Sequence, residues 1–214
     1  MRKFPIFLIL ATSCLFLSNR DSIAQDAMDQ SFQIKEVKAS LLTTPSATGL
    51  TKTTPPGRTQ SKWMDLDAEF SWKPSKEDAK NPFIEELTLE FYAMLETAQS
   101  KEVQRTLLSG KTTLVHVGEN RQIHAAMYVS PRAMEQLFMG KMPPTAGPSV
   151  VSATGLVISR GGSPVATFTS KPKFKFWENP DPTTKVMAGM LLPKSKTPFA
   201  NAAWDYYEQE KVDK

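Results

Sequence analysis

The sequence predicts a mostly β protein: an antiparallel β-sandwich of about seven strands, with one short inserted helix and one C-terminal helix. Three observations support this fold class. Apolar and polar residues alternate along several segments, as in half-buried antiparallel strands. Turns rich in Gly and Pro separate these segments, and no regular alternation of strands with helices suggests parallel crossovers. With 214 residues, 40% of them hydrophobic, the chain is long enough to bury a core.

The N-terminal residues predict a secretory signal peptide. A basic start, an apolar run over 4–17 and small residues before a cut after Ala24 follow the layout of such signals. The apolar run is too short to span a bilayer comfortably. We therefore expect residues 1–24 to be removed and residues 25–214 to form a single exported domain. We expect this domain in the periplasm or at the outer membrane or cell surface, without a membrane span.

Cys14 is the only cysteine and lies inside the predicted signal peptide. The mature chain would then lack disulfides, so an apolar core must hold its fold. A lipid anchor on Cys14 is the alternative interpretation, because the preceding residues resemble a lipobox, although Ala11 stands where Leu is usual. The formal net charge of +4 is too small to indicate a nucleic-acid partner.

The first half of the mature chain predicts three strands. Residues 32–41 alternate with a slip in register near Glu36, as at a β-bulge. Residues 43–60 are rich in Thr, Pro, Ser and Gly and predict a surface loop. The clearest strand covers residues 64–72, where apolar residues occupy every second position. Residues 87–95 also alternate and predict a strand, with a helix as the alternative.

The second half predicts a hairpin made of residues 106–117 and 122–129. A cap at Ser130, Pro131 behind it and Gly140 beyond its end predict a short helix over 132–139. Further strands are expected at 150–159 and 164–170, the latter continuing towards 174–177, and a terminal helix is expected over 199–212. These short strands favour an immunoglobulin-like sandwich in architecture alone, because the Cys…Trp…Cys core of true immunoglobulin domains is absent.

Two histidines are the candidates for metal binding or catalysis. A three-residue loop in the predicted hairpin would place His116 opposite His124, whereas a two-residue loop would place them on opposite faces. A zinc site needs three or four ligands, and no HExxH motif or nearby cysteine supplies them. We expect ordinary strand histidines, no cofactor and no enzyme; a hydrolase using His116 or His124 is the least favoured alternative.

The charged residues on the predicted strands are expected to face solvent. Asp65, Asp67 and Glu69 share one face of their strand and lack the pattern of a calcium loop. The lysines at 171, 173 and 175 alternate with Phe174 and Phe176, which predicts lysines outside and aromatic rings inside.

Aromatic residues supply the candidates for binding. Near the C-terminus these are Phe199, Trp204, Tyr206 and Tyr207, which we expect either to dock on the parent domain or to contact a protein partner. Trp63 is expected to be exposed on the acidic face of its strand. With Trp177 it forms the basis of the alternative function, a glycan-binding module at the cell surface.

Segments 191–200 and 203–208, together with 38–45 and 62–65, resemble secreted immunoglobulin-like proteins of Verrucomicrobia of the Akkermansia type, which are encoded near pilus-associated outer-membrane genes. The resemblance implies an immunoglobulin-like fold and a role in envelope or pilus-like assembly, with envelope or pilus-assembly proteins as partners. It carries over no catalytic residue. Residues 25–30 are polar, unlike the apolar start of a polymerising pilin, so the resemblance favours an accessory or adhesive component.

Overall fold

The computed structural model describes residues 25–27, 31–45, 61–74, 81–99, 102–119, 122–140, 143, 145–147, 149–203 and 206–211. The predictions for the signal peptide, for a lipid anchor on Cys14 and for most of the loop 43–60 lie outside these residues, as does Trp204.

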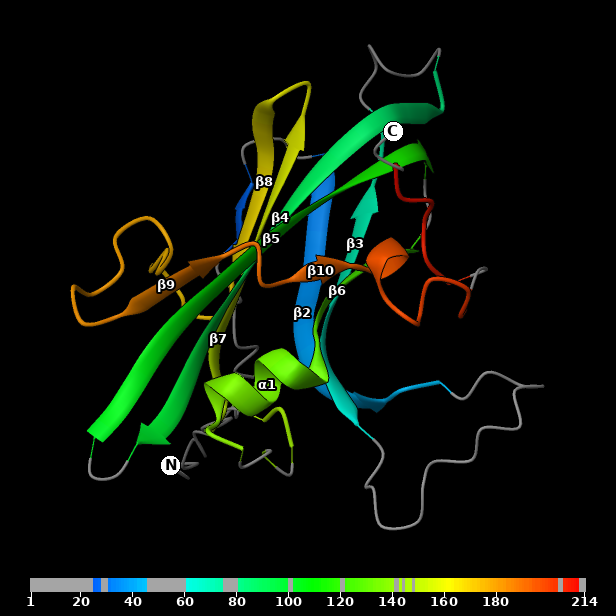
Figure 1. Cartoon of the computed structure of the whole chain (residues 1–214). Helices are drawn as coiled ribbons and strands as arrows, with labels where there is room; N and C mark the ends of the chain where they lie inside the picture. Colours follow the sequence, from blue (N-terminus) through cyan, green and yellow to red (C-terminus); the bar gives the residue numbers. More distant parts are fainter. Residues whose placement is uncertain are drawn as a thin grey trace, which may run out of the picture.

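Within the described residues the strands form two sheets (Figure 1). The six-stranded sheet has the order β1 (Gln25–Ala27), β8 (Ser163–Thr169), β7 (Val151–Arg160), β4 (Phe83–Gln99), β5 (Glu102–Gly118) and β9 (Lys185–Ala188). The four-stranded sheet has the order β10 (Leu192–Pro193), β6 (Gln122–Val129), β3 (Lys62–Trp72) and β2 (Phe32–Thr43). Neighbouring strands are antiparallel except β5 and β9. The prediction of a mostly β protein is therefore confirmed.

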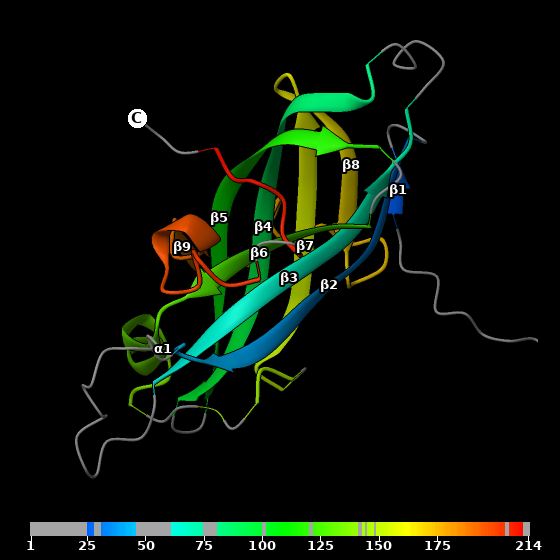
Figure 2. The same cartoon turned by 90° about the vertical axis from the view of Figure 1, so that its right-hand side faces the viewer.

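The two sheets pack face to face around one apolar core. Figure 2 shows β2 and β3 running obliquely across the strands of the larger sheet. Alternation on β3 buries Met64, Leu66, Ala68, Phe70 and Trp72, and the odd-numbered residues of β4 from Leu87 to Leu95 face them from the other sheet. The strand predicted at 64–72 and the strand predicted at 87–95 are both confirmed.

Two local predictions are confirmed in detail. The register of β2 on β3 shifts between Ile34 and Glu36, where the alternation slips in the sequence. Helix α1 (Pro131–Leu137) begins after Ser130, whose hydroxyl accepts a hydrogen bond from the backbone N–H of Ala133 at 3.3 Å. Both features depend on residues close together in the sequence.

The predicted hairpin is wrong. β5 pairs with β4 and β6 pairs with β3, so these two consecutive strands lie in different sheets. Strand β4 also continues to Gln99 and β5 starts at Glu102, so both strands extend beyond the predicted ranges 87–95 and 106–117. Alternation of apolar and polar residues shows which face of a strand is buried. It does not show which strand pairs with which, because consecutive strands alternate in the same way in a hairpin and in two opposed sheets.

The predicted C-terminal helix is not found in the described residues. After the 3₁₀ turn η2 (Lys194–Lys196), residues 198–203 form turns and Glu210 bridges to Leu114 of β5. Residues 171–178 also form turns in place of a continued strand, which leaves Phe174 55% exposed while Phe176 is buried. The expectation that both phenylalanines face inward was wrong for Phe174.

Candidate interaction surface

The outer face of the four-stranded sheet carries a polar recess that we call the acidic recess. It has a volume of about 270 Å³ and is lined by Glu36, Lys38, Ser40, Asp65, Asp67, Glu69, His124 and Tyr206. The period of two in β3 places its three acidic residues on the side opposite the core. β2 and β6 border them on either side. The acidic strand face therefore becomes the floor of a recess, and the expectation that its residues face solvent was wrong for Asp65, which is buried.

The C-terminal segment covers part of this outer face. The Phe199 ring stacks on Tyr128, with ring centroids 4.8 Å apart, and meets Trp63 edge-on at 5.8 Å. All three side chains are buried. The indole N–H of Trp63 donates to the Thr44 hydroxyl at 3.1 Å. Trp63 lies on the acidic side of β3 as expected, but the expectation that it is exposed was wrong, because the returning segment covers it.

Two tyrosines connect the C-terminal segment to the acidic recess. The Tyr206 ring stacks on His124 with centroids 3.9 Å apart. The Tyr207 hydroxyl donates to Asp67 Oδ2 at 3.1 Å, and His124 Nδ1 lies 3.3 Å from Asp67 Oδ1. Tyr206 remains 49% exposed at the rim. Residues 140 positions apart in the chain thus meet at one carboxylate.

The carboxylates of the recess differ in their electrostatic environment. Burial raises the pKa of Asp65, although Ser40 donates to its Oδ1 at 2.5 Å. Burial likewise raises the pKa of Asp67 above its usual value, against the opposing effect of His124. At Glu69 burial is the largest single effect and raises the pKa, but hydrogen bonds from Lys35 and Gln122 together outweigh it, so the pKa lies below its usual value.

A second set of contacts fastens the C-terminal segment to η2. The Glu210 carboxylate accepts the backbone N–H groups of Lys194 and Ser195 at 3.0 and 2.8 Å. The buried Lys194 side chain donates to the Ala200 carbonyl at 3.1 Å and lies over the Tyr207 ring, 5.2 Å from its centroid. Burial lowers the pKa of the Lys194 ammonium. These contacts attach the segment that carries Tyr206 and Tyr207 to the rest of the domain.

The two histidines do not lie opposite each other. His116 is exposed on β5 of the six-stranded sheet, whereas His124 is buried on β6 of the four-stranded sheet. The hairpin geometry that could have paired them is absent because β5 and β6 belong to different sheets. Within the described ranges no three His, Cys, Asp or Glu side chains are grouped so as to hold a metal ion.

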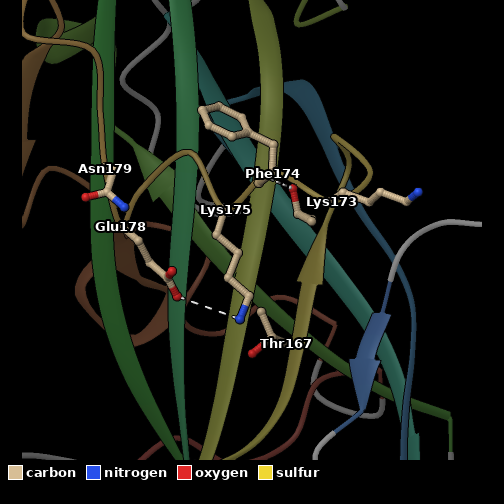
Figure 3. A pocket seen from close by; sticks show the side chains of 7 residues that line it. Thr167, Lys173, Phe174, Lys175, Glu178 and Asn179 are labelled. Atoms are coloured by element: carbon tan, nitrogen blue, oxygen red, sulfur yellow. Dashed lines mark hydrogen bonds and ion pairs between the residues drawn. The ribbon is translucent and has the colours of Figure 1, made fainter.

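The outer face of the six-stranded sheet carries a separate pocket of about 320 Å³, shown in Figure 3. Lys173, Phe174 and Lys175 line it from the turn region, and Thr167 lines it from β8. Lys175 Nζ lies 3.7 Å from Glu178 Oε1. The pocket brings two of the three alternating lysines beside an exposed aromatic ring.

Trp177 lies over the same sheet, stacked on Tyr92 with ring centroids 4.8 Å apart. Gly155 lies beneath it, and a Cβ there would come within 2.3 Å of the indole. Trp177 is half-buried. Trp63 and Trp177 therefore cover opposite outer faces of the sandwich and do not form one platform for a sugar ring.

The four C-terminal aromatic candidates have different positions. Phe199 is buried against its own domain, Tyr207 is half-buried at Asp67, Tyr206 is half-exposed, and Trp204 lies outside the described residues. Sequence reasoning did not connect them with Asp67 and His124. One signal was present: residues 123–129 form an almost continuous apolar run in the sequence, which is typical of a strand covered on both faces, and the structure buries all of them.

No helix among the described residues is long and apolar enough to cross a bilayer.

Comparison with known proteins gives a family match and a structural match. A family model matches residues 23–214. A crystal structure of a protein from Akkermansia muciniphila is 22% identical in sequence and has a TM-score of 0.68, covering 92% of this chain and 98% of that chain. At this identity the structural match shows a shared fold. No curated protein matches the chain.

Proposed function

Because the chain belongs to the family whose model matches residues 23–214, we propose that it is a non-enzymatic, exported envelope protein. It acts through protein–protein contacts as an accessory or adhesive component of a pilus-like or outer-membrane assembly. The fold shared with the Akkermansia muciniphila protein supports the resemblance noted in the sequence. The signal peptide and the place of the mature protein at the periplasm or cell surface are parts of this proposal.

The order of the long strands supports an immunoglobulin-like assignment. The seven long strands β2 to β8 can be lettered A, B, C, C′, E, F and G in sequence order. One sheet then has the order A-B-E and the other the order C′-C-F-G. In immunoglobulin-like domains strands A, B and E likewise oppose C, F and G. Such sandwiches commonly bind other proteins through their loops, faces and edges.

The main support for the proposal is that Tyr206 lies half-exposed at the rim of the acidic recess. Its ring is held by the stack on His124, and its neighbour Tyr207 is fixed to Asp67. Tyrosine is enriched at binding hot spots, and a ring already held in place loses little conformational entropy on binding. Carboxylates beside it favour a partner with basic groups.

The test compares co-purification from envelope extract by the wild type, Tyr206→Ala and Phe174→Ala. Phe174 is a matched control, because it is a similarly exposed aromatic residue in the turns beside the other sheet. We expect the wild type and Phe174→Ala to recover the same assembly components and Tyr206→Ala to recover at least about tenfold less. Equal recovery by all three proteins, together with unchanged surface structures in a gene-deletion strain, would contradict the proposal.

The glycan-binding alternative has less support from the geometry. A sugar-binding platform needs an exposed aromatic face, whereas Trp63 is 8% exposed and Trp177 is stacked on Tyr92. A glycan array with the purified protein tests it directly. The hydrolase alternative would use His116 or His124 singly, since they lie in different sheets. His-to-Ala substitutions at both positions test it by their effect on envelope phenotypes.

A further inference from the structure

One long strand edge of the sandwich has no partner strand within the described residues. Short strands cover three of the four edges formed by long strands: β1 pairs with β8, β9 with β5, and β10 with β6. β2, which is twelve residues long, pairs with β3 alone and forms the margin of the four-stranded sheet (Figure 2). An open edge of this kind presents backbone donors and acceptors to any other extended chain.

The hydrogen-bond pattern identifies which backbone groups face outward. The N–H of Thr44 donates to the carbonyl of Ser61 at 3.2 Å, so these directly opposed residues form a bonded pair. Bonded and non-bonded pairs alternate along an antiparallel ladder. From the register of β2 on β3, the backbone groups of Ser40 and Leu42 then face β3, while those of Ala39, Leu41 and Thr43 face away from it.

The first half of β2 is protected against pairing and the second half is not. The bulge between Ile34 and Glu36 bends the edge, and Lys35 carries an exposed charge. At Val37 the outward carbonyl already accepts the Thr154 hydroxyl at 3.0 Å. Residues 39–43, in contrast, contain no charge, proline or bulge. Natural proteins use such features to block edge pairing, so their absence over residues 39–43 marks a segment open to pairing.

We propose that residues 39–43 of β2 pair with the same segment of a second copy of this chain, antiparallel about a two-fold axis at Leu41. Leu41 then lies opposite its own copy, Ala39 opposite Thr43, and Lys38 opposite Thr44. The three outward-facing residues form about six backbone hydrogen bonds. The two four-stranded sheets become one continuous sheet. This interface goes beyond the proposed function, since it uses the backbone edge of β2 and not Tyr206, although Ser40 and Lys38 also line the acidic recess.

Charge and burial favour a second copy as the occupant. In this register no charged side chain opposes one of the same sign, because Lys38 faces a threonine and Glu36 lies beyond the paired segment. A two-fold axis makes the contact self-complementary, as in most dimers. The inner-face side chains of Ala39 and Leu41 pack against the core but remain partly exposed at the edge. Pairing would cover this apolar surface as well as the backbone groups.

Sedimentation equilibrium of the purified protein tests the interface. A small edge contact predicts a monomer–dimer equilibrium in the micromolar range. Thr43→Pro removes an outward N–H and no β3 bond, so it should shift the dimer dissociation constant upward by at least about tenfold with little change in thermal stability. Thr43→Ala retains the N–H and should dimerise as the wild type does. A wild type that stays monomeric, or a Thr43→Pro protein that dimerises normally, would overturn the proposal.

Disulfide trapping tests the register independently of proline effects on folding. In a Cys14→Ser background, Leu41→Cys places one thiol opposite its own copy, within the Cα separation that a disulfide tolerates. Ser40→Cys is the control, because residue 40 lies opposite residue 42. We expect Leu41→Cys to form a covalent dimer under mild oxidation and Ser40→Cys to remain uncrosslinked. The reverse result would refute the register. Both tests use the protein alone, so their failure is distinguishable from failure of the envelope co-purification.

Discussion

Replacing Phe199 with alanine removes the residue that fastens the C-terminal segment to the outer face of the four-stranded sheet. Its ring is 7% exposed, stacks on Tyr128 and meets Trp63 edge-on. Burying a phenylalanine side chain contributes about 1.5–3 kcal/mol, and each aromatic pair adds about 0.5–1.5 kcal/mol. We expect Phe199→Ala to lower the free energy of unfolding by about 3–4 kcal/mol, within the range of about 3–5 kcal/mol for buried Phe→Ala substitutions.

Urea unfolding followed by tryptophan fluorescence and circular dichroism measures this loss. The fluorescence of Trp63 should also shift to longer wavelength, because the indole loses its cover. Amide hydrogen exchange at Glu208 and Lys211 should become faster, since their backbone bonds to β6 and β5 depend on the segment staying docked. Phe174→Ala is the control and should change stability by less than about 0.5 kcal/mol. A loss below about 1 kcal/mol for Phe199→Ala, with unchanged exchange, would refute the reasoning.

Three further predictions concern the remainder of the structure. Ser130→Ala should destabilise the protein by about 1 kcal/mol in urea unfolding, because the helix loses its cap; an unchanged midpoint would contradict this role. Gly155→Ala should cost about 1–3 kcal/mol and expose Trp177 to acrylamide quenching, because the new Cβ meets the indole; unchanged quenching would argue against the contact. Burial raises the pKa of the Asp65 carboxyl, so its protonated form stabilises the folded state. This contribution to stability is fully present below the unfolded-state pKa and is lost as the pH rises through the folded-state pKa. The stability of Asp65→Asn relative to the wild type should therefore increase as the pH is raised from below 3.8, the ordinary pKa of an aspartate, through the higher folded-state pKa; a constant difference would refute the assignment.

Local features could be predicted because they depend on nearby residues. The alternation of β3, the bulge near Glu36 and the cap at Ser130 are each set within a few residues, and the structure has all three. The acidic side of β3 was likewise evident from its period of two. What the sequence did not indicate was that residues near the C-terminus lie against this side. The contact between Asp67 and Tyr207 depends on the whole fold.

Long-range choices were decided by tertiary packing. The sequence predicted a terminal helix over 199–212, yet the described residues form turns that place Phe199 against Tyr128 and Trp63, where it is buried. The uninterrupted burial along β6 is explained by the same segment.

The sequence by itself determined that the protein is built of strands and which side of most strands faces the core. Only the tertiary structure decided which strands pair, which sheet each histidine joins, and which edge stays open. The physical reason is that side-chain alternation is a property of one strand, whereas pairing depends on the combined burial and hydrogen bonding of strands far apart in the chain.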